Sequence, residues 1–250
     1  MELLVIDCET RALRRLPLRA EYLTLSYVWG ATARHDVAAG SHPGKLEKGI
    51  IPWNVPSTIN DSIVVCRKLG YRYLWVDRYC IPQDDPEERR RQIQRMDVIF
   101  QNSTLTIVAC AGIDPQYGLP GVSKSREQSP SISLQGAGYL QRTPKIEEIK
   151  KSVWAGRGWT YQETILSQMR LYFTDRQLYF ESENAVDCEW ITLAGANTIR
   201  IPGWEFSKNR QMAKPGYIYL AISEFSERSL SFQSDSLNAM SGIFAAFERK

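Results

Sequence analysis

Histidine is almost absent from this sequence. The chain has only His35 and His42, and both lie in the Gly- and Pro-bearing stretch 30–56. A Ser-His-Asp or Cys-His nucleophilic site needs a histidine that a third group holds on a rigid element. Neither histidine has that setting, so we expect carboxylates to carry any chemistry that this protein performs.

The cysteines form no metal-binding or redox motif. There is no CxxC pair, no Cys and His at zinc-ligand spacing, and the count is odd. Four of the five lie in apolar surroundings, which is typical of buried thiols in a reduced, intracellular protein. We therefore expect no metal site and no disulfide framework, and a cytoplasmic or nuclear location. The five are Cys8, Cys66, Cys80, Cys110 and Cys188.

Long apolar runs and charge of one sign are also missing. No window reaches the 18 or more apolar residues of a membrane helix, and the first residues lack the basic and apolar regions of a signal peptide. Lys plus Arg number 31 and Asp plus Glu 28, a net charge of +3. We expect no membrane partner, and this charge is too small to predict a nucleic-acid interface.

The 250 residues, 43% of them hydrophobic, are enough for one large domain with its own core. Short apolar runs alternate with amphipathic segments, which predicts an α/β fold with a parallel sheet flanked by helices. The expected strands are 3–6, 22–29, 73–76, 105–110, 170–173 and 177–180. The expected helices are 56–69, 86–100, 154–166 and 235–247.

Periodicity is lost in residues 111–152, where Gly, Pro and Ser recur at short intervals. We expect a long loop or lid there, since loops of that length inside a compact domain are usually functional or partly disordered. The expected organisation is a core domain over residues 1–190 and an α/β extension over 191–250 that packs on it.

Polar and aromatic residues gather at three places where predicted strands end or a helix begins. They are residues 26–30, 77–85 and 157–163. Ligands of open α/β sheets bind beyond the carboxyl ends of the strands, so we expect the three clusters to line one site. The residues expected to contact a ligand are Ser26, Tyr27, Trp29, Gly30, Asp77, Arg78, Gln83, Arg157, Trp159 and Gln162.

These clusters carry a resemblance to a known family. The segments SYVWG, LWVDRYCIPQDDPEERRRQIQRM and RGWTYQE, in this order, resemble the fungal heterokaryon-incompatibility (HET) domain over roughly residues 20–190, and residues 232–239 resemble its C-terminal pattern. Arg78-Tyr79 departs from the small or apolar residues usual there. The resemblance implies a role in non-self recognition and regulated cell death, with self-association or another incompatibility protein as partner.

The resemblance also implies a fold similar to Toll/interleukin-1 receptor (TIR) domains, which are flavodoxin-like, and with it a chemistry. Some TIR domains cleave NAD with a helix glutamate four positions after a tryptophan, and Trp159 and Glu163 have that spacing. By this resemblance Glu163 is the catalytic carboxylate, NAD or a related nucleotide is the substrate, and no cofactor is required.

Elementary chemistry is compatible with that reaction. Cleavage of the ribosyl–nicotinamide bond develops positive charge on the sugar, and the leaving group departs neutral, so one carboxylate suffices without a general acid. Tyr27, Trp29 or Trp159 offers an aromatic wall for a ring. Arg157 or Arg78 offers a cation for the pyrophosphate.

Two other functions stay open on the sequence. The same motifs suit a non-enzymatic module that signals by self-association through exposed aromatic and Arg side chains. A nuclease needs a metal, which Asp77, Asp84 and Asp85 could hold, although helix capping explains their clustering equally well. The basic run 89–91 shares its helix with acidic residues at ion-pairing distance, so we expect a solvated helix face there.

Overall fold

The structure is a computed structural model that describes residues 3–30, 49–82, 84–126, 131–134, 137–140, 146–183, 185–189 and 216–249. His35, His42 and the predicted ligand contact Gln83 lie outside these residues.

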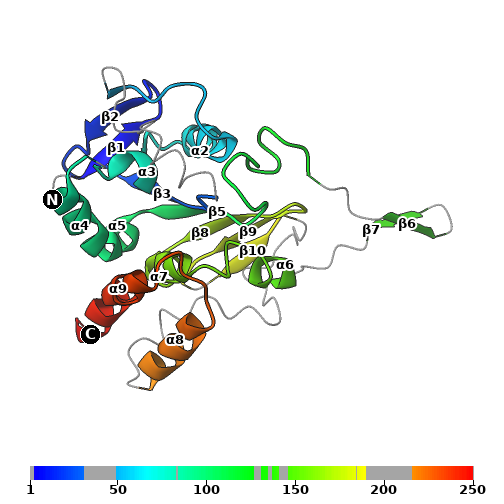
Figure 1. Cartoon of the computed structure of the whole chain (residues 1–250). Helices are drawn as coiled ribbons and strands as arrows, with labels where there is room; N and C mark the ends of the chain where they lie inside the picture. Colours follow the sequence, from blue (N-terminus) through cyan, green and yellow to red (C-terminus); the bar gives the residue numbers. More distant parts are fainter. Residues whose placement is uncertain are drawn as a thin grey trace.

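A mixed sheet of eight strands forms the centre of the molecule (Figure 1), with the order β10-β9-β8-β5-β3-β4-β1-β2. The four central strands β4, β3, β5 and β8 are parallel, and the strands on both sides of them are antiparallel. Burial on both faces favours parallel pairing for the apolar strands. The strands are β1 (Leu4–Asp7), β2 (Ala12–Arg15), β3 (Tyr22–Ser26), β4 (Tyr73–Trp75), β5 (Leu105–Ala109), β8 (Arg170–Phe173), β9 (Leu178–Glu181) and β10 (Val186–Cys188).

The connections between the parallel strands place a switch point in the middle of the sheet. From β3 the chain passes to β4 on one side, and then crosses back to β5 on the other side. The order β4-β3-β5-β8 is the order 2-1-3-4 of doubly wound flavodoxin-like sheets. The predicted α/β class is therefore confirmed, with antiparallel strands added at both edges. The carboxyl ends of β3 and β5 meet where such folds bind ligands.

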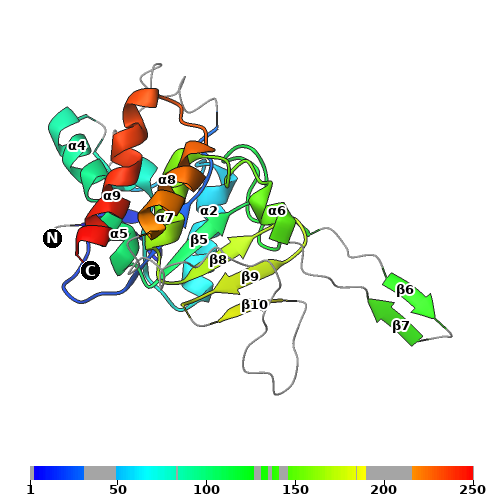
Figure 2. The ribbon, with the colours of Figure 1, turned by 90° about the horizontal axis from the view of Figure 1, so that it is seen from below.

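Helices cover both faces of this sheet. Figures 1 and 2 show α2 on one face and α5, α7 and α9 packed together on the other, with α8 beside them. None of the helices described has the length and apolar content that a bilayer crossing requires. The helices are α2 (Ser57–Lys68), α3 (Asp77–Cys80), α4 (Pro86–Gln94), α5 (Met96–Asn102), α6 (Ile146–Lys150), α7 (Gly158–Leu166), α8 (Tyr217–Ser226) and α9 (Ser236–Glu248).

The start of α4 shows how local sequence fixes an element. The Asp85 carboxylate accepts hydrogen bonds from the backbone N–H groups of Glu87 and Glu88, both at 3.0 Å, and Pro86 occupies the first turn. This is the N-cap predicted from the sequence. The expected single helix over 86–100 is interrupted, however, because Arg95 leaves helical geometry and separates α4 from α5.

The region 111–152 is more regular than its composition indicates. The expected long loop contains α6 and a two-stranded antiparallel hairpin, β6 (Ser131–Leu134) with β7 (Ala137–Leu140). These elements are only four or five residues long, and β6 and β7 pair with each other rather than with the main sheet. Elements this short carry too few residues to show a period.

Candidate functional site

A chain of hydrogen bonds joins the end of β3 to the middle of α7. Ser26, the last residue of β3, donates from its hydroxyl to Oε2 of Glu163. The indole Nε1 of Trp154 in turn donates to the Ser26 Oγ over 2.7 Å. Ser26 and Trp154 are each 1% exposed and Glu163 is 6% exposed. Three distant segments therefore meet at one buried carboxyl group.

Burial dominates the electrostatics of Glu163. Loss of solvation raises the pKa of its carboxyl group to about 8, and the negative charge of Asp77 adds to this. The Ser26 hydroxyl and the positive charge of Arg157 act in the opposite direction. A carboxyl group with such a pKa changes its charge near neutral pH, as acids and bases at functional sites often do.

Asp77 is the second carboxylate of the site and begins α3 directly after β4. Its Oδ2 accepts from the indole Nε1 of Trp29 over 2.7 Å, and its Oδ1 accepts from the backbone N–H of Arg78 over 2.7 Å. Burial raises the pKa of Asp77 to about 6, against the effect of these two donors and of Arg157. Trp29 therefore acts here through its N–H group, which orients the carboxylate.

Tyr27 has a polar atom without a partner. Its side chain is 4% exposed, and its hydroxyl makes no hydrogen bond to any residue that the structure describes. Burial, followed by the charge of Asp77, raises the pKa of this hydroxyl, and Glu163 contributes in the same direction. An unsatisfied buried hydroxyl costs about 1–3 kcal/mol. A ligand that hydrogen-bonds to Tyr27 would remove this cost.

Arg157 supplies the positive charge of the site. It is the N-cap residue of α7, half-buried, and its charge lowers the pKa of both Asp77 and Glu163. Within the described part of the chain its guanidinium makes no hydrogen bond or ion pair. A guanidinium without a protein partner is available to an anionic group of a ligand.

Three predicted contact residues have other surroundings. The Gln162 Oε1 accepts from the backbone N–H of Gly242 over 3.1 Å, which ties α7 to α9. Trp159 is half-buried and packs against the main hydrophobic core. Gly30 has a φ of 76°, and a Cβ atom there would lie 2.9 Å from Cδ of Pro115, so only glycine allows this close approach.

Trp154 is the site residue that sequence reasoning missed. The sequence predicts a helix over 154–166, but α7 begins at Gly158, so Trp154 lies in the short segment between α6 and α7. Its position three residues before Arg157, close to a polar and aromatic motif, was the one available clue.

The arrangement suits chemistry in which positive charge develops on the reacting group. Near the carboxyl ends of β3 and β4, at the edge of the sheet expected to bind ligands, lie the buried Glu163 carboxyl group and the half-buried Asp77 carboxyl group. The Arg157 guanidinium and the Tyr27 hydroxyl, which has no partner among the described residues, complete the site. Among the described residues, no cluster of three His, Cys, Asp or Glu side chains could hold a metal ion. The site can therefore offer a carboxylate, hydrogen-bond groups and a cation.

Comparisons with known proteins match the part of the chain that forms this site. The profile of the heterokaryon incompatibility protein (HET) family matches residues 22–163, which run from the start of β3 to Glu163. The chain is also similar to heterokaryon incompatibility protein 6, OR allele, of Neurospora crassa, with 32% identity over 94 residues. That alignment covers 35% of this chain and 14% of the relative. No solved structure matches the chain.

Proposed function

The chain belongs to the heterokaryon incompatibility family, and on this premise we propose that it acts in incompatibility and regulated cell death by hydrolysing NAD or a related nucleotide. Glu163 is the catalytic carboxylate of this proposal. The relative from Neurospora carries incompatibility in its name and supports the biological role. The reaction itself is supported by the site.

The observation that carries the proposal is the setting of the Glu163 carboxyl group. It is buried, it accepts from Ser26, and no basic side chain among the described residues forms an ion pair with it. A structural buried carboxylate is normally paired with a cation. A carboxylate whose cationic partner is the substrate has the environment seen here.

The proposed reaction follows from the positive charge of the substrate. A bound nicotinamide ribosyl group is cationic, and it lowers the pKa of the Glu163 carboxyl group so that the carboxylate forms in the complex. The N-glycosidic bond breaks with its electron pair going to the ring nitrogen, and nicotinamide leaves neutral. The carboxylate stabilises the positive sugar carbon, and water adds there with release of a proton.

Access to Glu163 requires a local movement. Its 6% exposure leaves no room for a nucleotide against the carboxylate. The segment between α6 and α7 carries Trp154 over the site and includes the exposed residues Lys151, Val153 and Gly156. We expect this segment to shift when substrate binds.

The test is nicotinamide release and NAD loss by the purified protein at several protein concentrations. Glu163→Gln keeps the size of the side chain and removes its charge, so turnover is expected to fall at least about 100-fold. Glu87→Gln, an exposed glutamate on α4, is the matched control and keeps full turnover. Equal turnover in wild type and Glu163→Gln contradicts the assignment of the site.

A second candidate function is self-association without catalysis, and the surface of α8 favours it. Tyr219, Leu220 and Ile222 on this helix are 76%, 40% and 44% exposed. Exposed apolar side chains grouped on one element are typical of interaction surfaces. If cell death persists with Glu163→Gln but is lost with Tyr219→Glu, together with oligomers seen by light scattering, assembly is the function.

A further inference from the structure

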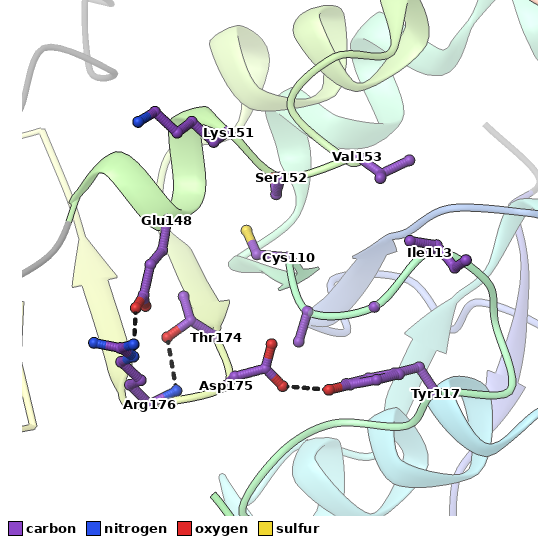
Figure 3. Close-up of a pocket in the computed structure, with 12 residues that line it drawn as sticks. Cys110, Ile113, Tyr117, Glu148, Lys151, Ser152, Val153, Thr174, Asp175 and Arg176 are labelled. Atoms are coloured by element: carbon purple, nitrogen blue, oxygen red, sulfur yellow. Dashed lines mark hydrogen bonds and ion pairs between the residues drawn. The ribbon is translucent and has the colours of Figure 1, made fainter. Parts of the chain in front are cut away.

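A second site lies at the same edge of the sheet, where β5 and β8 end. Figure 3 shows a cavity of about 440 Å³ between the loop after β5, the loop after β8, and the end of α6. Pockets for small molecules have volumes of about 300–1,000 Å³. Glu163 and the predicted ligand contacts do not line this cavity, so it is separate from the carboxylate site.

The walls of the cavity are braced by interactions among its own residues. The Tyr117 hydroxyl donates to Asp175, and Arg176 Nε lies 2.8 Å from Glu148 Oε1, as the dashed lines in Figure 3 show. Gly112 has a φ of 78°, and a Cβ atom there would lie 2.2 Å from Cγ of Tyr117. The loop and the ring therefore fit closely, and the cavity is preformed.

Among the described residues that line the cavity, Lys151 is the cation available to a ligand. Glu148 is paired with Arg176, and Asp175 accepts from Tyr117. Lys151 is exposed at the rim, and within the described ranges its ammonium makes no ion pair or hydrogen bond. A free ammonium beside a cavity attracts an anionic group such as a phosphate.

Two further features indicate what carries that anion. Asp175 lies two residues after the end of β8 and uses one of its acceptor positions for Tyr117, so it can still accept from hydroxyl groups. An acidic residue after a strand binds ribose hydroxyls in dinucleotide folds. Ile113 and Val153, which line the cavity, are 67% and 46% exposed and offer apolar surface to a base.

The geometry points to a nucleotide-binding site in this cavity, for a molecule with one base, one ribose and a phosphate. Lys151 meets the phosphate, Asp175 accepts from the ribose, and Ile113 and Val153 contact the base. This inference does not depend on hydrolysis at Glu163. The nucleotide is either half of a dinucleotide substrate or a free effector, and the experiment distinguishes the two.

The segment between α6 and α7 lines the cavity and also contacts the site around Glu163. Ser152 and Val153 line the cavity, and the next residue, Trp154, donates to Ser26, which donates to Glu163. A ligand that contacts Val153 therefore touches the segment that we expect to shift when substrate binds at Glu163.

The experiment is isothermal titration of the 250-residue chain with AMP, and with adenosine as the probe without phosphate. We expect AMP to bind about tenfold more tightly than adenosine. Lys151→Met removes this preference, and Lys150→Met, the exposed neighbouring lysine that does not line the cavity, retains it. Val153→Trp, a change at an exposed position, fills the cavity and abolishes AMP binding.

Absence of AMP binding at millimolar concentration by the folded protein overturns the site. Equal affinity for AMP and adenosine, or an equal loss in Lys150→Met and Lys151→Met, overturns it as well. Titration of NAD into the AMP complex of Glu163→Gln then shows whether the bound nucleotide is half of a dinucleotide substrate or a free effector. Displacement of AMP assigns the cavity to half of the substrate, and simultaneous binding assigns it to an effector. AMP binding without NAD turnover in wild type supports the cavity and refutes the proposed hydrolysis.

Discussion

Two glutamates of this protein are buried in different ways. Glu181, at the end of β9, is fully buried, and its Oε2 accepts from Arg170 Nε over 2.9 Å and from the Tyr172 hydroxyl over 2.7 Å. Glu163 is 6% exposed and accepts a hydrogen bond from the Ser26 hydroxyl, and the negative charge of Asp77 disfavours its ionisation. Both carboxyl groups are buried, but the arginine partner that compensates the charge of Glu181 has no counterpart at Glu163 among the described residues.

The comparison separates a buried carboxylate that stabilises the fold from one that does not. Arg170 also donates to the carbonyl oxygens of Thr164 and Ser167, so the Glu181 ion pair fastens the end of α7 to β8 and β9. The Glu163 carboxyl group has no cationic partner of this kind among the described residues, and its hydrogen bond is to the Ser26 hydroxyl. In the described part of the chain one buried glutamate has an arginine partner and the other has none, and this difference supports the proposed catalytic use of Glu163.

The largest expected effect is the loss of stability when the Arg170–Glu181 ion pair is broken. Glu181→Gln leaves the Arg170 guanidinium buried without its counter-charge, and loss of one partner of a buried ion pair costs about 3–5 kcal/mol. We expect the free energy of unfolding in urea to fall by that amount. Glu163→Gln is the matched substitution, and it leaves the free energy of unfolding at neutral pH equal or higher. Equal destabilisation by both variants would remove the distinction between the two glutamates.

The next effect is a pH dependence of stability that belongs to Glu163. Its pKa is about 8 in the folded protein against an ordinary value of 4.5, so between these values the folded protein holds a proton that the unfolded chain releases. Stability from this group is complete below the unfolded pKa and is lost as pH rises through the folded pKa. The slope is about 1.4 kcal/mol per pH unit for one proton.

The window from pH 6 to pH 8 isolates this effect, because the pKa of Asp77 is about 6 and its own contribution is lost by then. We expect the urea midpoint of the wild type to fall across this window, and that of Glu163→Gln to stay nearly constant. A wild-type curve parallel to that of Glu163→Gln would mean that the Glu163 carboxyl group titrates normally in the folded protein.

The sequence predicts the central elements for a reason that also explains what it misses. The strands β3 and β5 are apolar on both faces, and that composition identifies buried parallel strands without tertiary information. β2, β10 and α3 have three or four residues each, too few for any period. Their positions depend on neighbours that the local sequence does not specify.

The candidate site likewise contains residues that the local sequence predicts and residues whose contacts depend on the tertiary structure. The carboxyl-end rule for parallel strands brings Ser26 and Asp77 to one edge, and the sequence predicts both. The Trp154 hydrogen bond depends on how a non-periodic segment folds back over the sheet. The Arg170–Glu181 pair depends on the register of β8 with β9, which sets these two residues opposite each other.

The smallest expected effect concerns the group that supports Ser26. Trp154→Phe removes the indole N–H that donates to Ser26 Oγ, and one lost hydrogen bond costs about 1 kcal/mol. Because hydrogen bonds in a chain strengthen each other, a weaker Ser26 donor stabilises the Glu163 carboxylate less and raises its pKa further. Trp75→Phe is the control, since the buried Trp75 indole N–H has no partner among the described residues. We expect the pH dependence of unfolding to shift to higher pH in Trp154→Phe alone. If Trp75→Phe shifts it equally, lost packing, rather than the hydrogen-bond chain, sets the pKa of Glu163.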